Sequence, residues 1–313
     1  MNEARSPQII TRLVDGRICA YDLASEPLGV LEPTAVFRPS AGDEPVGAAV
    51  SADLRRAVYT TLNAVVCVSA AGEALWRSAL EPHSDQPHGH WPGCVLSLDG
   101  RAVWVYRPDA MAGRDGPDQW VALDAGTGAV VARTDLDTVG HGGGQFLHPQ
   151  DGSVLLDVGE GQDGSVIHRA APGEDGAPVV TAYPWWDRCL ISLAPGGEQF
   201  MTVHHEQRDV AFHRYPDGEV LFALSVEAFG HDPGAAYVEW SGGYLMPDTA
   251  VVTVAGENED GEEWFRCHLV DVRTGAVAGE FTAHALHADE VQPLGDGSWL
   301  TSDPFGHPVR RRG

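Results

Sequence analysis

The chain has 313 residues and a formal net charge of −25, and its 20 basic Lys+Arg side chains are all arginine because the sequence contains no lysine. The absence of lysine excludes a P-loop, which needs the lysine of its phosphate-binding motif, and it excludes Schiff-base catalysis. A chain this acidic repels phosphate backbones and anionic membrane surfaces, so we expect neither nucleic-acid nor membrane binding.

The composition indicates a soluble, cytoplasmic protein. The amino terminus is polar, with no apolar segment typical of a signal peptide, and no apolar run approaches the roughly 20 residues of a membrane-spanning helix. The cysteines are scattered and form no CxxC pair, which is typical of a reducing compartment rather than of a disulfide framework: Cys19, Cys67, Cys94, Cys189 and Cys267.

Short strand-like runs alternate with two kinds of turn along the whole chain, and helical periodicity is nearly absent. The chain opens with a hairpin over residues 9–23, turning at Gly16. Turns of the first kind then follow at Asp53, Asp99, Asp151, Gly196, Asp248 and Asp296. Turns of the second kind interleave with them at Gly16, Gly72, Gly128, Gly176, Gly218 and Gly275. The first series repeats about every 49 residues, within the range of propeller blades.

Each repeat therefore predicts four strands, A to D, with the first kind of turn between A and B and the second between C and D. Residues 97–136 show this pattern most clearly, and residues 191–226 repeat it. The small-residue-DG-R turns, the LDAGTG and VDVRTG turns and a Gly-His pair before strand A resemble degenerate WD40-like or TolB-like propeller repeats. The resemblance covers nearly the whole chain and implies a β-propeller, but no single family.

The number of turns favours six blades. We interpret the opening hairpin as strands C and D and the closing hairpin, residues 290–303, as strands A and B of one shared blade that closes the ring. The alternative is seven blades, with residues 28–37 and 307–312 as extra strands. In either case residues 1–313 form a single propeller domain, and residues 307–313 end it as a short basic tail.

Residues at equivalent early positions of the A strands are expected to converge at the mouth of the central channel. Counting back from each A–B turn places a ring of histidines and carboxylates there: Glu44, His90, His141 (or Gly142), Asp187, Glu239 and His287. Neutral imidazole and carboxylate together suit Zn, Fe, Mn, Cu or Ni, so we predict His90, His141, His287 and Glu44 as metal ligands. No nucleotide cofactor is expected.

The remaining ring residues are candidates for catalysis. Asp187 and Glu239 are predicted as ligands or general bases, and Arg188 as a fixed positive charge that could hold a carboxylate or phosphate. His205, with His204 beside it, ends a B strand and is predicted to point toward the same face. Aromatic residues that could wall a small-molecule pocket flank the ring: Trp91, Phe146, Trp186, Tyr237 and Trp240.

These residues support two functions. The first is a small-molecule-binding propeller, extending to a metal-dependent hydrolase, lyase or isomerase. The second is a non-catalytic scaffold that binds a protein partner, as WD40-like propellers commonly do. The second reading also explains the histidines, because the Gly-His pair of such repeats commonly orients a buried hydrogen-bond network. The sequence leaves both alternatives open.

Overall fold

The computed structural model describes residues 9–24, 28–86, 91–109, 111–173, 178–258 and 260–313. Strands dominate these residues, and the helical segments described are three 3-10 turns, η1 (Gly161–Asp163), η2 (Val226–Phe229) and η3 (Ala288–Glu290). The chain divides into two compact units. We call residues 7–26 and 32–186 the N-terminal unit, and residues 27–31 and 187–313 the C-terminal unit.

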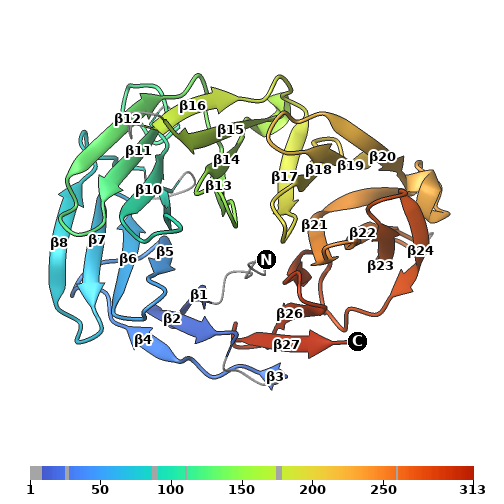
Figure 1. Cartoon of the computed structure of the whole chain (residues 1–313), viewed down its shortest axis with the longest axis horizontal. Helices are drawn as coiled ribbons and strands as arrows, with labels where there is room; N and C mark the ends of the chain where they lie inside the picture. The colour runs from blue at the N-terminus through green and yellow to red at the C-terminus, as the bar shows by residue number, and fades with distance from the viewer. Residues whose placement is uncertain (1–8, 25–27, 87–90, 110, 174–177, 259) are drawn as a thin grey trace. The chain divides into compact units, whose positions relative to one another are not determined.

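The N-terminal unit contains four sheets, coloured blue to yellow-green in Figure 1. The first has three described strands, β1 (Ile9–Val14), β2 (Arg17–Asp22) and β4 (Ala35–Phe37). The second has β5 (Gly47–Val50), β6 (Arg56–Thr61), β7 (Ala64–Ser69) and β8 (Ala74–Ala79). The third has β9 (Gly93–Leu96), β10 (Ala102–Arg107), β11 (Gln119–Asp124) and β12 (Val130–Asp135). The fourth has β13 (Gly143–Leu147), β14 (Val154–Gly159), β15 (Ser165–Pro172) and β16 (Pro178–Ala182).

The C-terminal unit contains three four-stranded sheets. The first has β17 (Arg188–Leu193), β18 (Gln199–His204), β19 (Asp209–Arg214) and β20 (Val220–Ser225). The second has β21 (Ala236–Met246), β22 (Thr249–Glu257), β23 (Glu263–Asp271) and β24 (Ala276–Phe281). The third joins β25 (Gln292–Pro293), β26 (Ser298–Ser302) and β27 (Pro308–Arg312) to β3 (Gly29–Val30) from the beginning of the chain.

The fold is an all-β propeller with seven blades, and the predicted fold class is confirmed. The structure has seven blades, which was the alternative count, and the favoured count of six is wrong. All six predicted A–B turns join the first two strands of a sheet, so the 49-residue repeat was assigned correctly. The count differs because the opening hairpin and the closing hairpin lie in two different sheets and do not share one blade.

The opening hairpin begins a blade of its own instead of completing the last one. β1 pairs with β2, β2 pairs with β4, and β1 lies against β5, the first strand of the next sheet. Its turn is a two-residue loop with positive φ at both Asp15 (49°) and Gly16 (69°), as a type I′ hairpin requires. The described hairpins between third and fourth strands at Gly72, Gly128, Gly218 and Gly275 instead contain a register shift.

The last sheet is completed by residues 28–31, as the seven-blade alternative predicted. Val309 pairs with Val30, and the backbone N–H of Leu31 donates to the carbonyl of Pro308 at 2.9 Å. Residues 308–312, which were expected to belong to a basic tail, therefore form strand β27. Arg310 is 9% exposed, and its guanidinium donates to the carboxylate of Asp296 at 2.6 Å. Asp296 lies in the turn that precedes β26.

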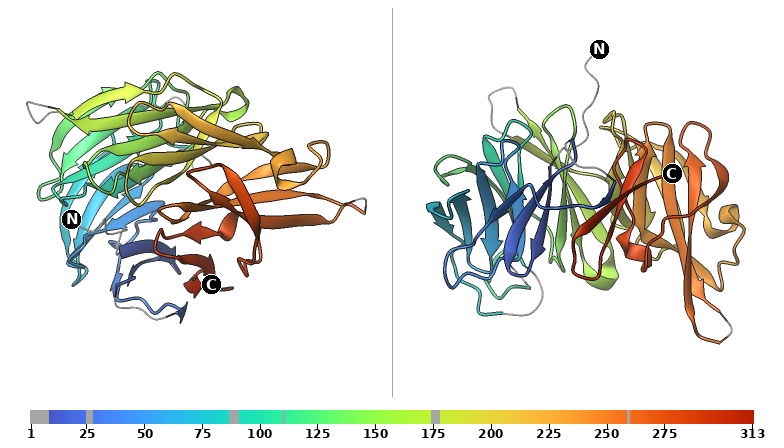
Figure 2. Two further views of the ribbon diagram at one scale, coloured as in Figure 1. Left: turned by 45° about the vertical axis from the view of Figure 1, so that its right-hand side comes forward. Right: turned by 90° about the horizontal axis from the view of Figure 1, so that it is seen from below.

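Burial follows the position of each strand in its sheet. The second strands are almost entirely buried, whereas β8, β12 and β20, the fourth strands, expose nearly every other side chain. The β22–β23 hairpin is longer than the equivalent hairpins and extends beyond the rest of its sheet (Figure 2), and the described residues at its end, 256–258 and 260–263, are rich in carboxylates. Among the described residues, no helix is long and apolar enough to cross a membrane.

Candidate functional site

The residues predicted to be catalytic lie in the C-terminal unit, and strand pairing brings three of them to one end of the β17–β20 sheet. Asp187 immediately precedes β17, Arg188 begins it, and Arg188 is paired in register with His204 at the end of β18. The backbone N–H of His205 donates to the carbonyl of Asp187 at 2.7 Å. Asp187, Arg188 and His205 therefore lie at the same end of this sheet.

Asp187 and His204 form an ion-pair contact. His204 Nε2 lies 3.5 Å from Asp187 Oδ2, and the backbone N–H of Glu206 donates to His204 Nδ1 at 2.9 Å. Because Nδ1 accepts a hydrogen bond, the proton of the neutral ring is on Nε2, directed toward Asp187. The His204 side chain is 14% exposed and that of Asp187 is 51% exposed. The Asp187 carboxylate therefore faces solvent while it contacts a mostly buried imidazole.

Arg188 is already paired. Its guanidinium contacts the carboxylate of Asp209, the first residue of β19, and the two side chains are 15% and 23% exposed. The same end of the sheet holds a second ion pair, between Arg208 and Glu206. The predicted role of Arg188 as a free anion-binding charge therefore has no support in the geometry. Sequence reasoning missed Asp209, because the pairing of β17, β18 and β19 that brings the two charges together is not visible locally.

Aromatic side chains of β21 adjoin this end of the sheet. The backbone N–H of Val238 donates to the carbonyl of Gln207 at 2.8 Å, which joins β21 to the β18–β19 turn. The ring of His205 lies 6.2 Å from that of Trp240, centre to centre. Tyr237 and Trp240 are 37% and 46% exposed. Burial, followed by the nearby carboxylates of the same sheet, raises the pKa of Tyr237.

We define the Asp187–Trp240 site as Asp187, His205, Tyr237, Glu239 and Trp240. Glu239 lies between the two aromatic residues on β21, and one of its carboxylate oxygens accepts the backbone N–H of Trp240 at 2.8 Å. Among the described residues, neither Asp187 nor Glu239 is paired with an arginine. The site therefore combines aromatic surface with two carboxylates whose charge no guanidinium neutralises.

The predicted metal ligands are distributed over both units. Glu44 and His141 are exposed in the N-terminal unit, and the ring of His141 lies beside Gly161, the first residue of η1. His287 is exposed in the C-terminal unit, where it precedes η3, and His90 lies outside the described residues. In the part of the chain that the structure describes, no group of three or more His, Cys, Asp or Glu side chains could hold a metal ion. Because His90 lies outside the described residues, the metal site stays a prediction.

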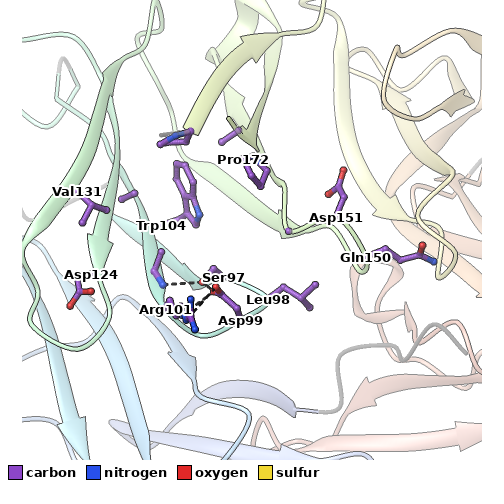
Figure 3. Close-up of a pocket in the computed structure, with 15 residues that line it drawn as sticks. Ser97, Leu98, Asp99, Arg101, Trp104, Asp124, Val131, Gln150, Asp151 and Pro172 are labelled. Carbon is purple, nitrogen blue, oxygen red and sulfur yellow. Dashed lines mark hydrogen bonds and ion pairs between the residues drawn. The ribbon is translucent and has the colours of Figure 1, made fainter. Parts of the chain in front are cut away.

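A cleft of about 630 Å³ lies elsewhere, between the β9–β12 and β13–β16 sheets of the N-terminal unit. It contains none of the residues predicted as catalytic or metal-binding. Sequence reasoning did not find it because its lining combines turn residues that were read as purely structural with residues of neighbouring strands, which only the packing of the two sheets brings together (Figure 3).

No family model and no curated protein matches the chain, whereas 802 chains of solved structures resemble it. The dihydro-heme d1 dehydrogenase NirN in complex with DHE is similar over 97% of this chain and 63% of its own, at a TM-score of 0.54 and 15% identity. Hydrazine synthase of Kuenenia stuttgartiensis is similar over 82% of this chain and 72% of its own, at a TM-score of 0.52 and 12% identity. BamB from Moraxella catarrhalis is similar over 100% of this chain and 95% of its own, at a TM-score of 0.52 and 14% identity. This chain spans just under two thirds of NirN, and identities this low establish the fold alone.

Proposed function

We propose that this protein binds a small organic cation, an amine attached to an aromatic or apolar body, at the Asp187–Trp240 site. The observation that carries the proposal is the position of exposed Trp240 beside the ring of His205, whose backbone N–H binds the carbonyl of Asp187, with exposed Tyr237 and the carboxylate of Glu239 on the same strand as Trp240. Aromatic faces attract cations, and a neighbouring carboxylate adds a charge-assisted hydrogen bond to an ammonium group.

The local charge balance supports a cation over an anion. Arg188 is neutralised by Asp209 and Arg208 by Glu206, so these guanidinium groups contribute no free positive charge. The remaining carboxylates, Asp187 and Glu239, make the site negative. His204 orients Asp187 through its Nε2–H and is a positioning residue in this proposal.

The proposal is tested by calorimetric titration with benzylammonium at pH 7 and low ionic strength. We expect Glu239→Gln and Trp240→Ala each to weaken binding about fivefold or more, since a cation–π or ion-pair contact is worth on the order of 1 kcal/mol. Glu219→Gln is the matched control, because Glu219 is an exposed carboxylate paired with Arg214 near the far end of β19. Equal losses in Glu239→Gln and Glu219→Gln would show only general attraction to an acidic chain and would overturn the proposal.

A protein-binding scaffold is the second candidate. It is favoured by apolar side chains exposed on fourth strands of the N-terminal unit, including Val131 on β12 at 60% and Val179 on β16 at 55%. Recovery of one stoichiometric partner whose binding is lost when Val131 and Val179 are replaced by Thr would support this function. Partner binding that survives both substitutions would exclude these strands.

Metal-assisted hydrolysis, elimination or isomerisation is tested separately. Elemental analysis of protein purified without a polyhistidine tag is the measurement. A near-stoichiometric transition metal that disappears in His141→Ala and His287→Ala would support the predicted ligands. A metal-free protein that still binds benzylammonium would exclude metal involvement while leaving the cation site intact.

A further inference from the structure

A pocket of about 520 Å³ lies in the C-terminal unit, between the end of β24 and the last sheet. Its wall is apolar: Phe281 packs edge-on against buried Trp299, with ring centres 4.6 Å apart, and Leu28, which is 56% exposed, continues the wall. The indole N–H of Trp299 donates to the carbonyl of Ala283 at 2.8 Å, which fixes the orientation of this ring. The pocket shares no residue with the Asp187–Trp240 site.

Strand pairing places Arg311 beside this apolar wall. Arg311 of β27 lies directly opposite Trp299 of β26 in the antiparallel register, so the two side chains project from the same face of the sheet. The Nε–H of Arg311 donates to Oγ1 of Thr301, which is two residues from Trp299 and therefore on the same face, at 3.0 Å. This bond leaves the two terminal nitrogens of the guanidinium without a hydrogen-bond or ion-pair partner among the described residues.

The neighbouring charges make this region positive. Arg310 and Arg312 also line the pocket, and both contact the carboxylate of Asp296, at 2.6 and 3.7 Å. One carboxylate cannot neutralise both guanidinium groups, and the unpaired guanidinium adds a third positive charge. Glu280, which adjoins the pocket on β24, is itself paired with Arg266 at 2.6 Å. The pocket is therefore a local reversal of sign in a chain whose net charge is −25.

An oxyanion attached to an apolar body matches these features. The terminal nitrogens of a guanidinium present two parallel N–H groups, which fit two oxygens of a phosphate or a carboxylate. A phosphate monoester carries roughly −1.5 to −2 charges at pH 7, so it matches a group of arginines better than a singly charged carboxylate does. An arginine without an ion-pair partner is not sufficient by itself, because exposed Arg133 on β12 is another and does not line this pocket.

We propose that the pocket binds a small phosphate monoester that carries an apolar or aromatic group. Arg311 binds the phosphate through its terminal nitrogens, half-exposed Arg312 contributes a second positive charge, and the organic group packs on Phe281 and Leu28. The inference does not depend on the organic-cation site, since the two sites share no residue and take ligands of opposite charge.

Isothermal titration calorimetry with phenyl phosphate and with inorganic phosphate, at neutral pH and about 0.15 M NaCl, tests the proposal. We expect phenyl phosphate to saturate one site with a Kd below about 1 mM, and inorganic phosphate to bind at least about fivefold more weakly. Because the chain as a whole is strongly acidic, general electrostatic attraction does not explain such binding. The absence of saturable binding of phenyl phosphate up to about 10 mM overturns the proposal.

Arg311→Gln removes the positive charge and keeps a side chain that can form hydrogen bonds. We expect this variant to bind both ligands at least about tenfold more weakly, because the charge-assisted hydrogen bonds to the phosphate are lost. Arg133→Gln is the matched control and should change either affinity less than about twofold. An unchanged far-ultraviolet circular dichroism spectrum shows that each variant is folded. Equal losses in the two variants would contradict a phosphate site at Arg311.

Leu28→Ala tests the apolar wall at an exposed position, where a substitution leaves the core intact. We expect phenyl phosphate to bind about threefold more weakly and inorganic phosphate to bind with unchanged affinity, because only the organic group loses a contact. A variant that weakens both ligands equally, or neither of them, contradicts the packing of the organic group on this wall.

Discussion

At the scale of single residues, several polar side chains are held in one protonation state by their surroundings. His213 is fully buried in β19, where Nδ1–H donates to the carbonyl of Gly218 at 3.1 Å and Nε2 accepts the hydroxyl of Thr202 at 2.8 Å. Burial is the main cause that lowers its pKa to about 4. A proton on Nε2 would also displace the hydrogen bond from Thr202, so the folded protein keeps this imidazole neutral.

The stability of the protein should therefore depend on pH through His213. Its pKa is about 6.5 in the unfolded chain and lower in the folded one, so acid favours the unfolded chain. The contribution is complete above pH 6.5 and is lost as the pH falls toward 4, reaching on the order of 3 kcal/mol. Urea titrations at pH 7, 6 and 5 should show a smaller loss in His213→Gln than in the unmodified protein. The same pH dependence in both proteins would contradict this assignment.

Asp118 is the centre of a buried hydrogen-bond network in the N-terminal unit. It is completely buried, and it accepts the hydroxyls of Tyr106 and Thr138, each at 2.9 Å, and the backbone N–H groups of Asp109 and Gly140, at 2.8 and 2.7 Å. A Cβ at position 140 would lie 1.8 Å from the Tyr106 hydroxyl oxygen, so only glycine permits this approach. The backbone of the Gly140-His141 pair thus joins a structural network.

Replacing Asp118 with Asn should destabilise the protein by about 2–4 kcal/mol, because an amide nitrogen would face donors inside the protein. Tyr106→Phe removes one hydroxyl and should cost less, about 1 kcal/mol. The free energy of unfolding in urea measures both changes. A loss below that of Tyr106→Phe would show that the network tolerates the amide and would argue against its assigned importance.

The candidate site could be predicted in part. Position within the repeat placed Asp187 and Arg188 at the beginning of a first strand, and His204 and His205 at the end of the second strand that pairs with it. The partner of Arg188 could not be predicted, because Asp209 meets it only through the pairing of three strands. Predicting a set of metal ligands requires the direction of each side chain. An error of one residue in the strand register reverses that direction.

At the scale of strands and hairpins, regular turn chemistry made most of the fold predictable. The Asp and Gly residues of the internal turns identified the strand pairs that they join, because each turn type needs those residues at fixed places. The opening turn was misassigned because Asp15-Gly16 resembles the glycine-containing turns between third and fourth strands. The distinguishing signal is loop length: Val14 pairs directly with Arg17, whereas the loop after Asp124 is longer and is accompanied by a register shift.

The last sheet provides a prediction at this scale. Arg310 joins β27 to the β25–β26 turn, through Asp296 at 2.6 Å and Ser298 Oγ at 3.1 Å. Arg310→Met keeps the length of the side chain but leaves Asp296 without this partner, and we expect a loss of about 1–3 kcal/mol in the free energy of unfolding. Arg312→Met, at a half-exposed guanidinium 3.7 Å from the same carboxylate, is the control and should cost under about 0.5 kcal/mol. Equal costs would contradict the anchoring role of Arg310.

At the scale of the whole molecule, the fold supports binding without selecting a ligand. A propeller fold does not by itself determine the chemistry of the sites that it carries. The charge of the chain is more informative. A net charge of −25 without any lysine raises the local concentration of cations around the protein and disfavours anionic ligands. The Asp187–Trp240 site adds to this general attraction an aromatic surface that can select among cations.

The central claim, an organic-cation site in the C-terminal unit, is tested most directly by the charge dependence of binding. Benzylammonium, benzyl alcohol and benzoate have nearly the same shape and differ in charge, and each can be titrated into the unmodified protein while the indole N–H signal of Trp240 is followed by NMR. We predict a saturable shift with benzylammonium, at least about tenfold weaker binding of benzyl alcohol, and none of benzoate. Binding of benzoate as tight as that of benzylammonium, or no shift of the Trp240 signal with any of the three, would contradict the account.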